Sequence, residues 1–354
     1  MCSTALPLDY STVQFQNLKK LAAEAGVQLH PRRNSPSGNE GGVTLRETEA
    51  APPVRPQRDC LTEFWEPASE ARNVRLVWDG RLMTRSSLGH TLILQSHPGD
   101  EIACAGLLQH CRNPVVVFAT DGMTETESSC PTNRRRETLR YLRRQEATTA
   151  LVLAGVRQVE FLSDYRNKLR DLHLHRAVPN LFNVMCQMIA RYHPETVLVP
   201  AYEGGHPDHD VCSFVGALIR KRLNMSVWEM PLYHKADTGE LVSQRFRKMN
   251  GNEFIYLLNP QELGRRAAMM ACYTSRRDFA DLSADDTECY RPQDEYDYSR
   301  PPQSGTVHYA NWRCPVSPSE LCQQLAQYAH GVKVPLEVLG SQRPGRLEIS
   351  SGSR

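Results

Sequence analysis

The chain has 354 residues, 40% apolar and 23% charged, enough for one large domain or two small ones with an ordinary core. Its 42 Lys and Arg against 40 Asp and Glu give a net charge of +2, which excludes a global field that would favour nucleic acid or an anionic membrane as partner. The eleven cysteines are dispersed without a CxxC pair. This pattern is typical of free thiols in a reducing, cytoplasmic compartment, rather than of a zinc ribbon or a redox motif.

The first 70 residues contain little that could form a core. Residues 11–26 have the periodicity and capping-box spacing of a single docking helix. Residues 31–59 are rich in Pro, Gly, Ser and charge and are interpreted as a linker or surface strap. The N-terminus lacks the pattern of a signal peptide, and no segment approaches the roughly 20 apolar residues that span a bilayer. We interpret residues 1–70 as an N-terminal extension.

From residue 88 onward, short apolar runs alternate with helical periodicity. Strands are predicted at 91–96, 114–120, 159–162, 196–201 and 226–234, and helices follow the first four of them. Continuous apolar strands that alternate with helices predict an α/β fold with a doubly wound, Rossmann-like parallel sheet, covered by helices on both faces. In such a sheet, ligands bind beyond the carboxyl ends of the strands.

The part of the chain after the parallel strands is predicted in less regular elements. Residues 240–259 have the pattern of a β-hairpin, and residues 259–279 that of a helix capped by Asn259 with Glu262 three residues later. We place the end of the main domain, 88–285, after this helix. Residues 286–354 are loop-rich, contain one late helix near 320–330, and are predicted to pack on the main domain as a C-terminal extension.

Two strand ends carry related polar motifs, SHPGDE (96–101) and GGHPDHD (204–210). One such His-Pro turn would be interpreted as a capped helix start. Two of them at the carboxyl ends of adjacent parallel strands would bring His97, Asp100 and His209 together. Two histidines and one carboxylate with an open position hold catalytic zinc, and the same set also suits iron. The sequence therefore predicts a metal site at this edge of the sheet.

With these motifs in place, residues 88–277 resemble the LmbE-like zinc de-N-acetylases, the family of N-acetylglucosaminyl-phosphatidylinositol de-N-acetylase. The resemblance is carried, in order along the chain, by HPGDE, VVFATDG (116–122), RRQEATTALVLAGV (143–156), PAYEGGHPDHD (200–210) and RRAAMMACYTSR (265–276). It implies that His97, Asp100 and His209 bind Zn²⁺. It also implies that His206, oriented by Asp208, is catalytic and donates to the oxyanion or to the leaving amine.

The resemblance implies two substrate-binding residues and reveals one departure. Arg143 resembles the family's substrate-contacting arginine, and Asp164 resembles an acidic residue that reaches sugar hydroxyls. The family's general-base aspartate, however, is replaced by Gly99. Since a general base contributes about 10²–10⁴ in rate and zinc can activate water without one, the loss is severe without being fatal. Glu101 and Asp121 are the substitute bases that we consider.

The resemblance therefore implies a zinc-dependent hydrolase that removes an acetyl group from an N-acetylated sugar or sugar conjugate. The alternative, which Gly99 favours, is a weak or inactive relative that binds an N-acyl sugar or a partner. A third reading is Fe²⁺ chemistry at the same ligands. His308 has no partner at metal-ligand spacing and is interpreted as a surface or core residue. The substrate and the oligomeric state stay open.

Overall fold

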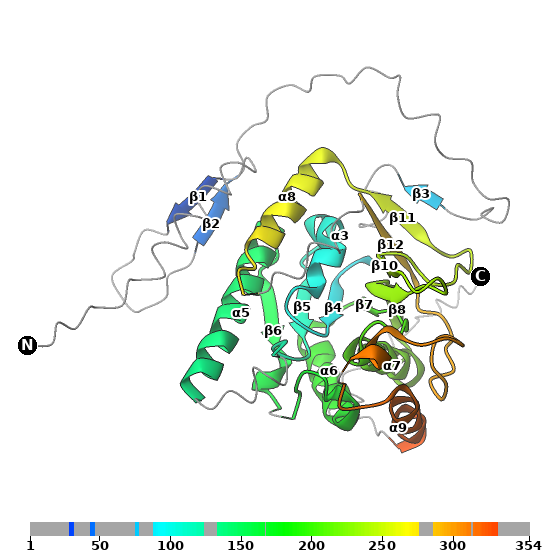
Figure 1. Ribbon diagram of the computed structural model, residues 1–354. Helices are drawn as coiled ribbons and strands as arrows, with labels where there is room; N and C mark the ends of the chain where they lie inside the picture. Colours follow the sequence, from blue (N-terminus) through cyan, green and yellow to red (C-terminus); the bar gives the residue numbers. More distant parts are fainter. Residues whose placement is uncertain are drawn as a thin grey trace, which may run out of the picture.

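Figure 1 shows a computed structural model of the chain. The structure describes residues 28–31, 43–46, 75–77, 88–123, 133–166, 168–275, 286–312 and 314–331. The helix predicted at 11–26 and most of the linker predicted at 31–59 lie outside these residues. β1 (Gln28–Pro31) pairs antiparallel with β2 (Val43–Arg46), which lies within the predicted linker, and this pairing was not predicted from the sequence.

Five parallel strands form the centre of an eight-stranded sheet. In spatial order they are β6 (Gln158–Phe161), β5 (Val115–Phe118), β4 (Thr91–Gln95), β7 (Thr196–Pro200) and β8 (Ser226–Met230). The direction of winding reverses between β4 and β7, which pair in parallel with Ile93 opposite Leu198. The predicted doubly wound α/β fold is confirmed for this part of the sheet. Both polar motifs follow strands at the reversal point, where α/β sheets bind ligands.

Helices cover both faces of the sheet (Figure 1). One face carries α3 (Ala105–His110), α5 (Asn133–Leu153) and α8 (Pro260–Ala271), and the other carries α6 (Val178–Tyr192), α7 (Pro207–Leu223) and α9 (Pro318–Gly331). None of the helices in the described part of the chain is both long and apolar enough to span a bilayer.

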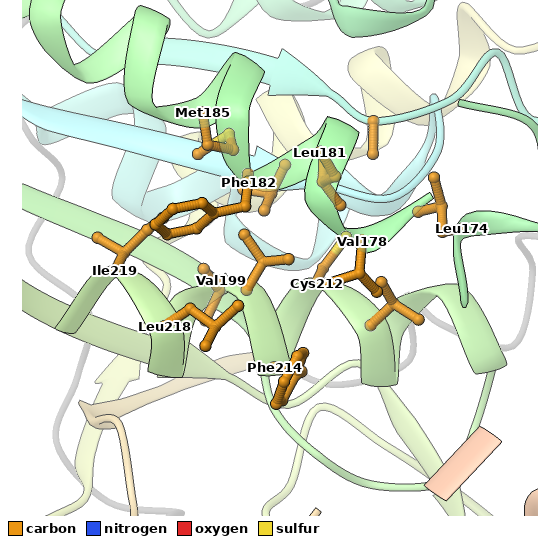
Figure 2. Close-up of a cluster of buried hydrophobic side chains, with 14 of the residues drawn as sticks. Leu174, Val178, Leu181, Phe182, Met185, Val199, Cys212, Phe214, Leu218 and Ile219 are labelled. Carbon is orange, nitrogen blue, oxygen red and sulfur yellow. The ribbon is translucent and has the colours of Figure 1, made fainter. Parts of the chain in front are cut away.

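The apolar strands are buried on both faces because successive side chains of a strand point to opposite sides. In β4, Leu92 and Leu94 belong to the core beneath α6 and α7, whereas Ile93 belongs to the core beneath α3 and α5. Figure 2 shows the first of these cores, in which Phe182 of α6 approaches Ile219 of α7. This burial explains why the strands are continuously apolar.

The opposite edge of the sheet is mixed. β12 (Thr287–Pro292) pairs antiparallel with β8 and with β11 (Phe254–Leu257), and β3 (Arg75–Val77) pairs parallel with β11. The C-terminal extension therefore contributes a strand to the main sheet in addition to packing on it. Its predicted late helix is α9.

Two strand predictions need correction. The strand predicted at 226–234 is two strands, because Pro231 interrupts it and β9 (Tyr233–Lys235) starts a separate sheet. The hairpin predicted at 240–259 is wrong: β10 (Leu241–Ser243) pairs with β9, and β11 pairs with β12. The Gln244 N–H donates to the Leu232 carbonyl at 2.9 Å, which extends the pairing between β9 and β10 by one residue.

The capping box predicted for α8 is confirmed by reciprocal hydrogen bonds between Asn259 and Glu262. The helix ends at Ala271, earlier than the predicted residue 279. Past this end, the Thr274 and Ser275 N–H groups donate to the Glu146 carboxylate of α5 at 2.8 and 2.9 Å. The eight cysteines of the described residues are all free thiols, in agreement with the composition.

Candidate metal centre

The first motif forms a tight turn after β4. The Asp100 carboxylate accepts the backbone N–H of His97 at 2.9 Å, and the Gly99 N–H donates to Glu101 Oε2 at 2.7 Å. Gly99 has φ +107°, a conformation that glycine adopts without strain, and the short 3₁₀ helix η2 (Asp100–Cys104) starts directly after it. This turn directs the His97 and Asp100 side chains to one point beyond the sheet.

The second motif forms the start of α7. His206 is the N-cap and Pro207 the first helical residue, so that His209 lies in the first turn. A Cβ atom at Gly205 would overlap the Tyr233 carbonyl oxygen, so only glycine permits this approach of the loop to β9. The Asp210 carboxylate accepts the Gly204 N–H at 3.0 Å and closes the loop.

Within the described residues, two groups place their possible ligand atoms within 4.8 Å of one another: His97 with His206 and His209, and His97 with Asp171 and Asp208. The predicted trio shares His97 and His209 with the first group, and Asp100 contacts both of these histidines. Asp100 Oδ2 lies 3.3 Å from His97 Nδ1 and 3.3 Å from His209 Nε2. Tetrahedral bonds of about 2.0–2.2 Å to zinc separate neighbouring ligand atoms by about 3.3–3.6 Å. All three residues are buried, and His209 Nε2 is a buried atom without a hydrogen bond of acceptable geometry. The donor set therefore fits a divalent metal such as Zn²⁺.

The charges within the cluster follow from the contacts among its own residues. Burial by itself would lower the pKa of His97, but the Asp171 and Asp100 carboxylates raise it well above its ordinary value. Burial would raise the pKa of Asp100, but His209 and His97 lower it well below its ordinary value. Asp100 is thus an anion at neutral pH, as a carboxylate ligand must be.

Two carboxylates face the other nitrogen of His97. Asp171 Oδ1 lies 2.9 Å and Asp208 Oδ2 3.3 Å from His97 Nε2. Asp208 is fully buried and also accepts the backbone N–H groups of Leu172 and Leu174 at 2.7 and 3.2 Å. Carboxylates in this position fix the tautomer of a metal-binding histidine and increase its basicity. The family resemblance implied that Asp208 orients His206, and no motif of the sequence pointed to Asp171.

His206 is oriented by the backbone of Asp208 instead. The Asp208 N–H donates to His206 Nδ1 at 3.2 Å. The His206 ring lies 4.5 Å from the ring of His97 and 5.0 Å from that of His209, measured between centroids. Burial and then the neighbouring His97 and His209 lower the pKa of His206 well below its ordinary value. His206 is therefore a neutral imidazole beside the metal ligands.

The two substitute bases considered from the sequence are both engaged elsewhere. Glu101 is fully buried and accepts hydrogen bonds from the Gly99 N–H and the Tyr273 hydroxyl, and burial raises its pKa to about 7. Asp121 Oδ2 pairs with Arg140 Nε at 2.7 Å. Asp121 does line a cleft of about 260 Å³, which it shares with Asp171.

The two predicted substrate-binding residues lie near this cleft without lining it. Arg143 is buried and donates to the Gly122 carbonyl, so it supports the loop after β5. Asp164 is held by Arg144 of α5 through hydrogen bonds of 2.7 and 2.8 Å. The cleft is lined by Asp121, Met123, Arg136, Glu137, Arg140, Ser163, Leu169, Arg170 and Asp171.

The fold and the donor set define a Rossmann-like domain with a candidate metal site of two histidines and a carboxylate. Residues 92–219 match the family model of PIG-L, GlcNAc-PI de-N-acetylase. This match agrees with the resemblance that the motifs implied, and the matched residues include every residue of the cluster described above. None of the curated proteins matches the chain.

Solved structures with a similar fold include a deacetylase triple mutant of teicoplanin biosynthesis, at 15% identity and a TM-score of 0.42, covering 57% of this chain and 97% of the other. The N,N'-diacetylchitobiose deacetylase of Pyrococcus horikoshii is 15% identical, with a TM-score of 0.37 and coverages of 57% and 76%. The 4-carboxy-2-hydroxymuconate hydratase GalB of Pseudomonas putida is also 15% identical, with a TM-score of 0.39 and coverages of 59% and 97%. None of these resemblances is close enough to transfer an activity.

Proposed function

We propose that this protein is a zinc-dependent hydrolase that removes an acetyl group from the amine of an N-acetylated sugar or sugar conjugate. One observation carries the proposal: within the residues that match the PIG-L family model, Asp100 Oδ2 lies 3.3 Å from both His97 Nδ1 and His209 Nε2. These three residues would hold the zinc ion. When bound, zinc polarises a carbonyl group and lowers the pKa of water to about 7.

His206 is the residue that we assign to stabilise the oxyanion. Because its Nδ1 accepts the Asp208 N–H, the neutral ring carries its proton on Nε2. A neutral Nε2–H can donate a hydrogen bond to the charge that develops on the carbonyl oxygen. Giving up that proton to the amine would leave an imidazolate. The geometry therefore favours the first of the two roles that the family resemblance implies for His206.

Position 99 supplies no proton acceptor, and the engaged oxygens of Glu101 and Asp121 make them poor substitutes. Asp171 is better placed, because it lines the cleft and also adjoins the candidate metal site, with its Oδ1 2.9 Å from His97 Nε2 and 4.0 Å from His206 Nε2. We assign it two functions. Its carboxylate orients His97, and it accepts a proton from a water molecule in the cleft and returns that proton to the departing amine.

The proposal is tested by measuring acetate release from a panel of N-acetylglucosamine glycosides with zinc-loaded protein. We expect release by the wild-type chain and none by the His209→Ala variant, which lacks one metal ligand. If the wild-type chain releases no acetate across the panel while metal analysis confirms bound zinc, the proposed activity is excluded.

A second candidate is a protein that binds an N-acyl sugar without hydrolysing it. It is favoured by Gly99, which lacks the carboxylate of a general base and whose φ of +107° favours glycine over aspartate. Binding of a glycoside without any acetate release would support this candidate. Measurable turnover that depends on His209 would exclude it.

A further inference from the structure

Trp312 is a partly exposed tryptophan beside the catalytic centre. Its side chain is 38% exposed, and its ring centroid lies 5.4 Å from that of His206. A large apolar side chain exposed next to a reacting centre indicates a surface that contacts a ligand. Trp312 belongs to the C-terminal extension, beyond the residues that match the family model.

A continuous series of aromatic rings joins Trp312 to the metal ligands. The ring of His308 lies edge-on to that of Trp312 at 5.0 Å, and Tyr233 lies 5.8 Å beyond His308. Tyr233 in turn contacts the ring of His209 at 5.4 Å. Burial and the nearby Lys235 lower the pKa of His308, so its ring is neutral at neutral pH. Trp312 and His308 thus form one uncharged wall beside the metal cluster.

This wall is attached to the loop that carries His206. The His308 N–H donates to the Gly204 carbonyl at 2.8 Å, and Val307 is buried against Gly204. Gly204 has φ +71°, and a Cβ atom there would lie 2.6 Å from Val307. The Trp312 N–H donates to the Tyr309 carbonyl at 3.1 Å, which continues the 3₁₀ helix η6 (His308–Asn311). These bonds fix the backbone that carries Trp312, and the indole itself contacts the rings of His206 and His308.

We propose that the Trp312 ring, backed by His308, stacks on the sugar ring of the substrate and determines its selectivity. This inference rests on the proposed function and names the residue that would select a pyranose. The C–H groups of one pyranose face are weakly positive and apolar, and they fit the negative face of an aromatic ring. Because the Trp312 ring contacts that of His206, a ligand whose amide reaches the metal would bring its sugar ring against the exposed part of Trp312.

The test uses zinc-loaded full-length protein and methyl N-acetyl-β-glucosaminide as the probe, with its dissociation constant measured by calorimetry. We expect Trp312→Ala to weaken binding about tenfold and Trp312→Phe about two- to threefold, since phenylalanine keeps an aromatic face. The zinc affinity of both variants stays at the wild-type value. Met249→Ala, which removes another partly exposed apolar side chain, between β10 and β11, leaves both affinities unchanged.

Equal binding by the wild-type chain and Trp312→Ala overturns the inference, and so does an absence of glycoside binding by the wild-type chain. A parallel loss of zinc affinity also overturns it, because Trp312 would then support the metal site in place of the sugar. Acetate release is measured separately. If binding depends on Trp312 but no acetate is released, the proposed function is refuted and the role of Trp312 in sugar binding stands. If acetate is released at a rate that does not depend on Trp312, the proposed function stands and the role of Trp312 is refuted.

Discussion

Asp171 Oδ1 lies 2.9 Å from Nε2 of His97, while the other ring nitrogen of His97 faces Asp100 at 3.3 Å. One imidazole therefore connects the candidate metal site to a carboxylate that lines the cleft of about 260 Å³. Such a contact sets which nitrogen of the ring binds metal and how strongly it does so.

Replacement of Asp171 by asparagine keeps a hydrogen-bond acceptor for His97 and removes the charge. We expect Asp171→Asn to lower zinc affinity by about 10–100-fold, measured by competition with a chelator. At saturating zinc, a further fall in kcat would report the loss of the proton acceptor. Asp237→Asn, at an exposed ion pair with Arg247, should bind zinc as the wild type does. Wild-type zinc affinity in Asp171→Asn would contradict the orienting role.

Zinc should stabilise the folded chain, because it binds the native site and has no such site in the unfolded state. At about 100 times the dissociation constant, the expected gain in unfolding free energy is about 2.7 kcal/mol. His209→Ala should abolish this gain, whereas His193→Asn should preserve it, since His193 is exposed with φ +47°, which asparagine tolerates. The measurement is thermal unfolding with zinc and with chelator. Metal analysis of protein purified without added metal decides between zinc and iron.

Two substitutions at Gly99 separate the effect of backbone strain on stability from the effect of the missing carboxylate on the reaction rate. At φ +107°, any L-residue is strained, and both Gly99→Ala and Gly99→Asp should lower the unfolding free energy by about 1–3 kcal/mol. The two variants differ only in the carboxylate. If the pocket lost its base at this position, Gly99→Asp should release acetate at least about 100 times faster than Gly99→Ala. Equal rates would indicate that the base lies elsewhere.

Substitution by alanine should lower the stability at one glycine, which is in tight contact, and raise it at another, which is exposed within a helix. Gly205→Ala would place a methyl group on the Tyr233 carbonyl oxygen, and we expect a loss of about 2 kcal/mol or more in unfolding free energy together with weaker zinc binding. Gly264 is exposed within α8 and has no atom within 4 Å of the new Cβ, so Gly264→Ala should gain about 0.5–1 kcal/mol. Chemical denaturation measures both, and a tolerated Gly205→Ala would show that the loop can move away from β9.

Glu288 should make stability fall as pH rises from about 5 to 7. Burial raises the pKa of this carboxyl to about 7 in the folded chain, so the native state keeps a proton that the unfolded chain has lost. Over that pH interval, the loss of this proton preference should lower the free energy of unfolding by about 3 kcal/mol. Glu288→Gln should therefore flatten the pH dependence, whereas Glu295→Gln, at a fully solvated site, should not. Denaturation curves at pH 5 and 7.5 provide the comparison, and an unchanged slope in Glu288→Gln would show that Glu288 is ionised at both values.

The parallel core could be predicted from sequence because its signals are local. A buried strand is continuously apolar, and a following helix shows its period within one segment, so β4 and β7 and their helices needed no tertiary information. The strand pairings at the mixed edge did need it. β11 finds its partner in β12, beyond α8, and no local pattern distinguishes that partner from the nearer β10.

What the sequence by itself determined is the parallel sheet and the proximity of His97, Asp100 and His209, since the ends of two adjacent parallel strands lie at one edge by geometry alone. Only the tertiary structure brought Asp171 to His97 and Trp312 to His206. Both residues lie on segments whose paths are set by hydrogen bonds to distant backbone groups, Leu172 to Asp208 and His308 to Gly204. Such contacts join residues that are distant in the sequence and leave no local pattern, so they could not be predicted from the sequence and are seen only in the tertiary structure.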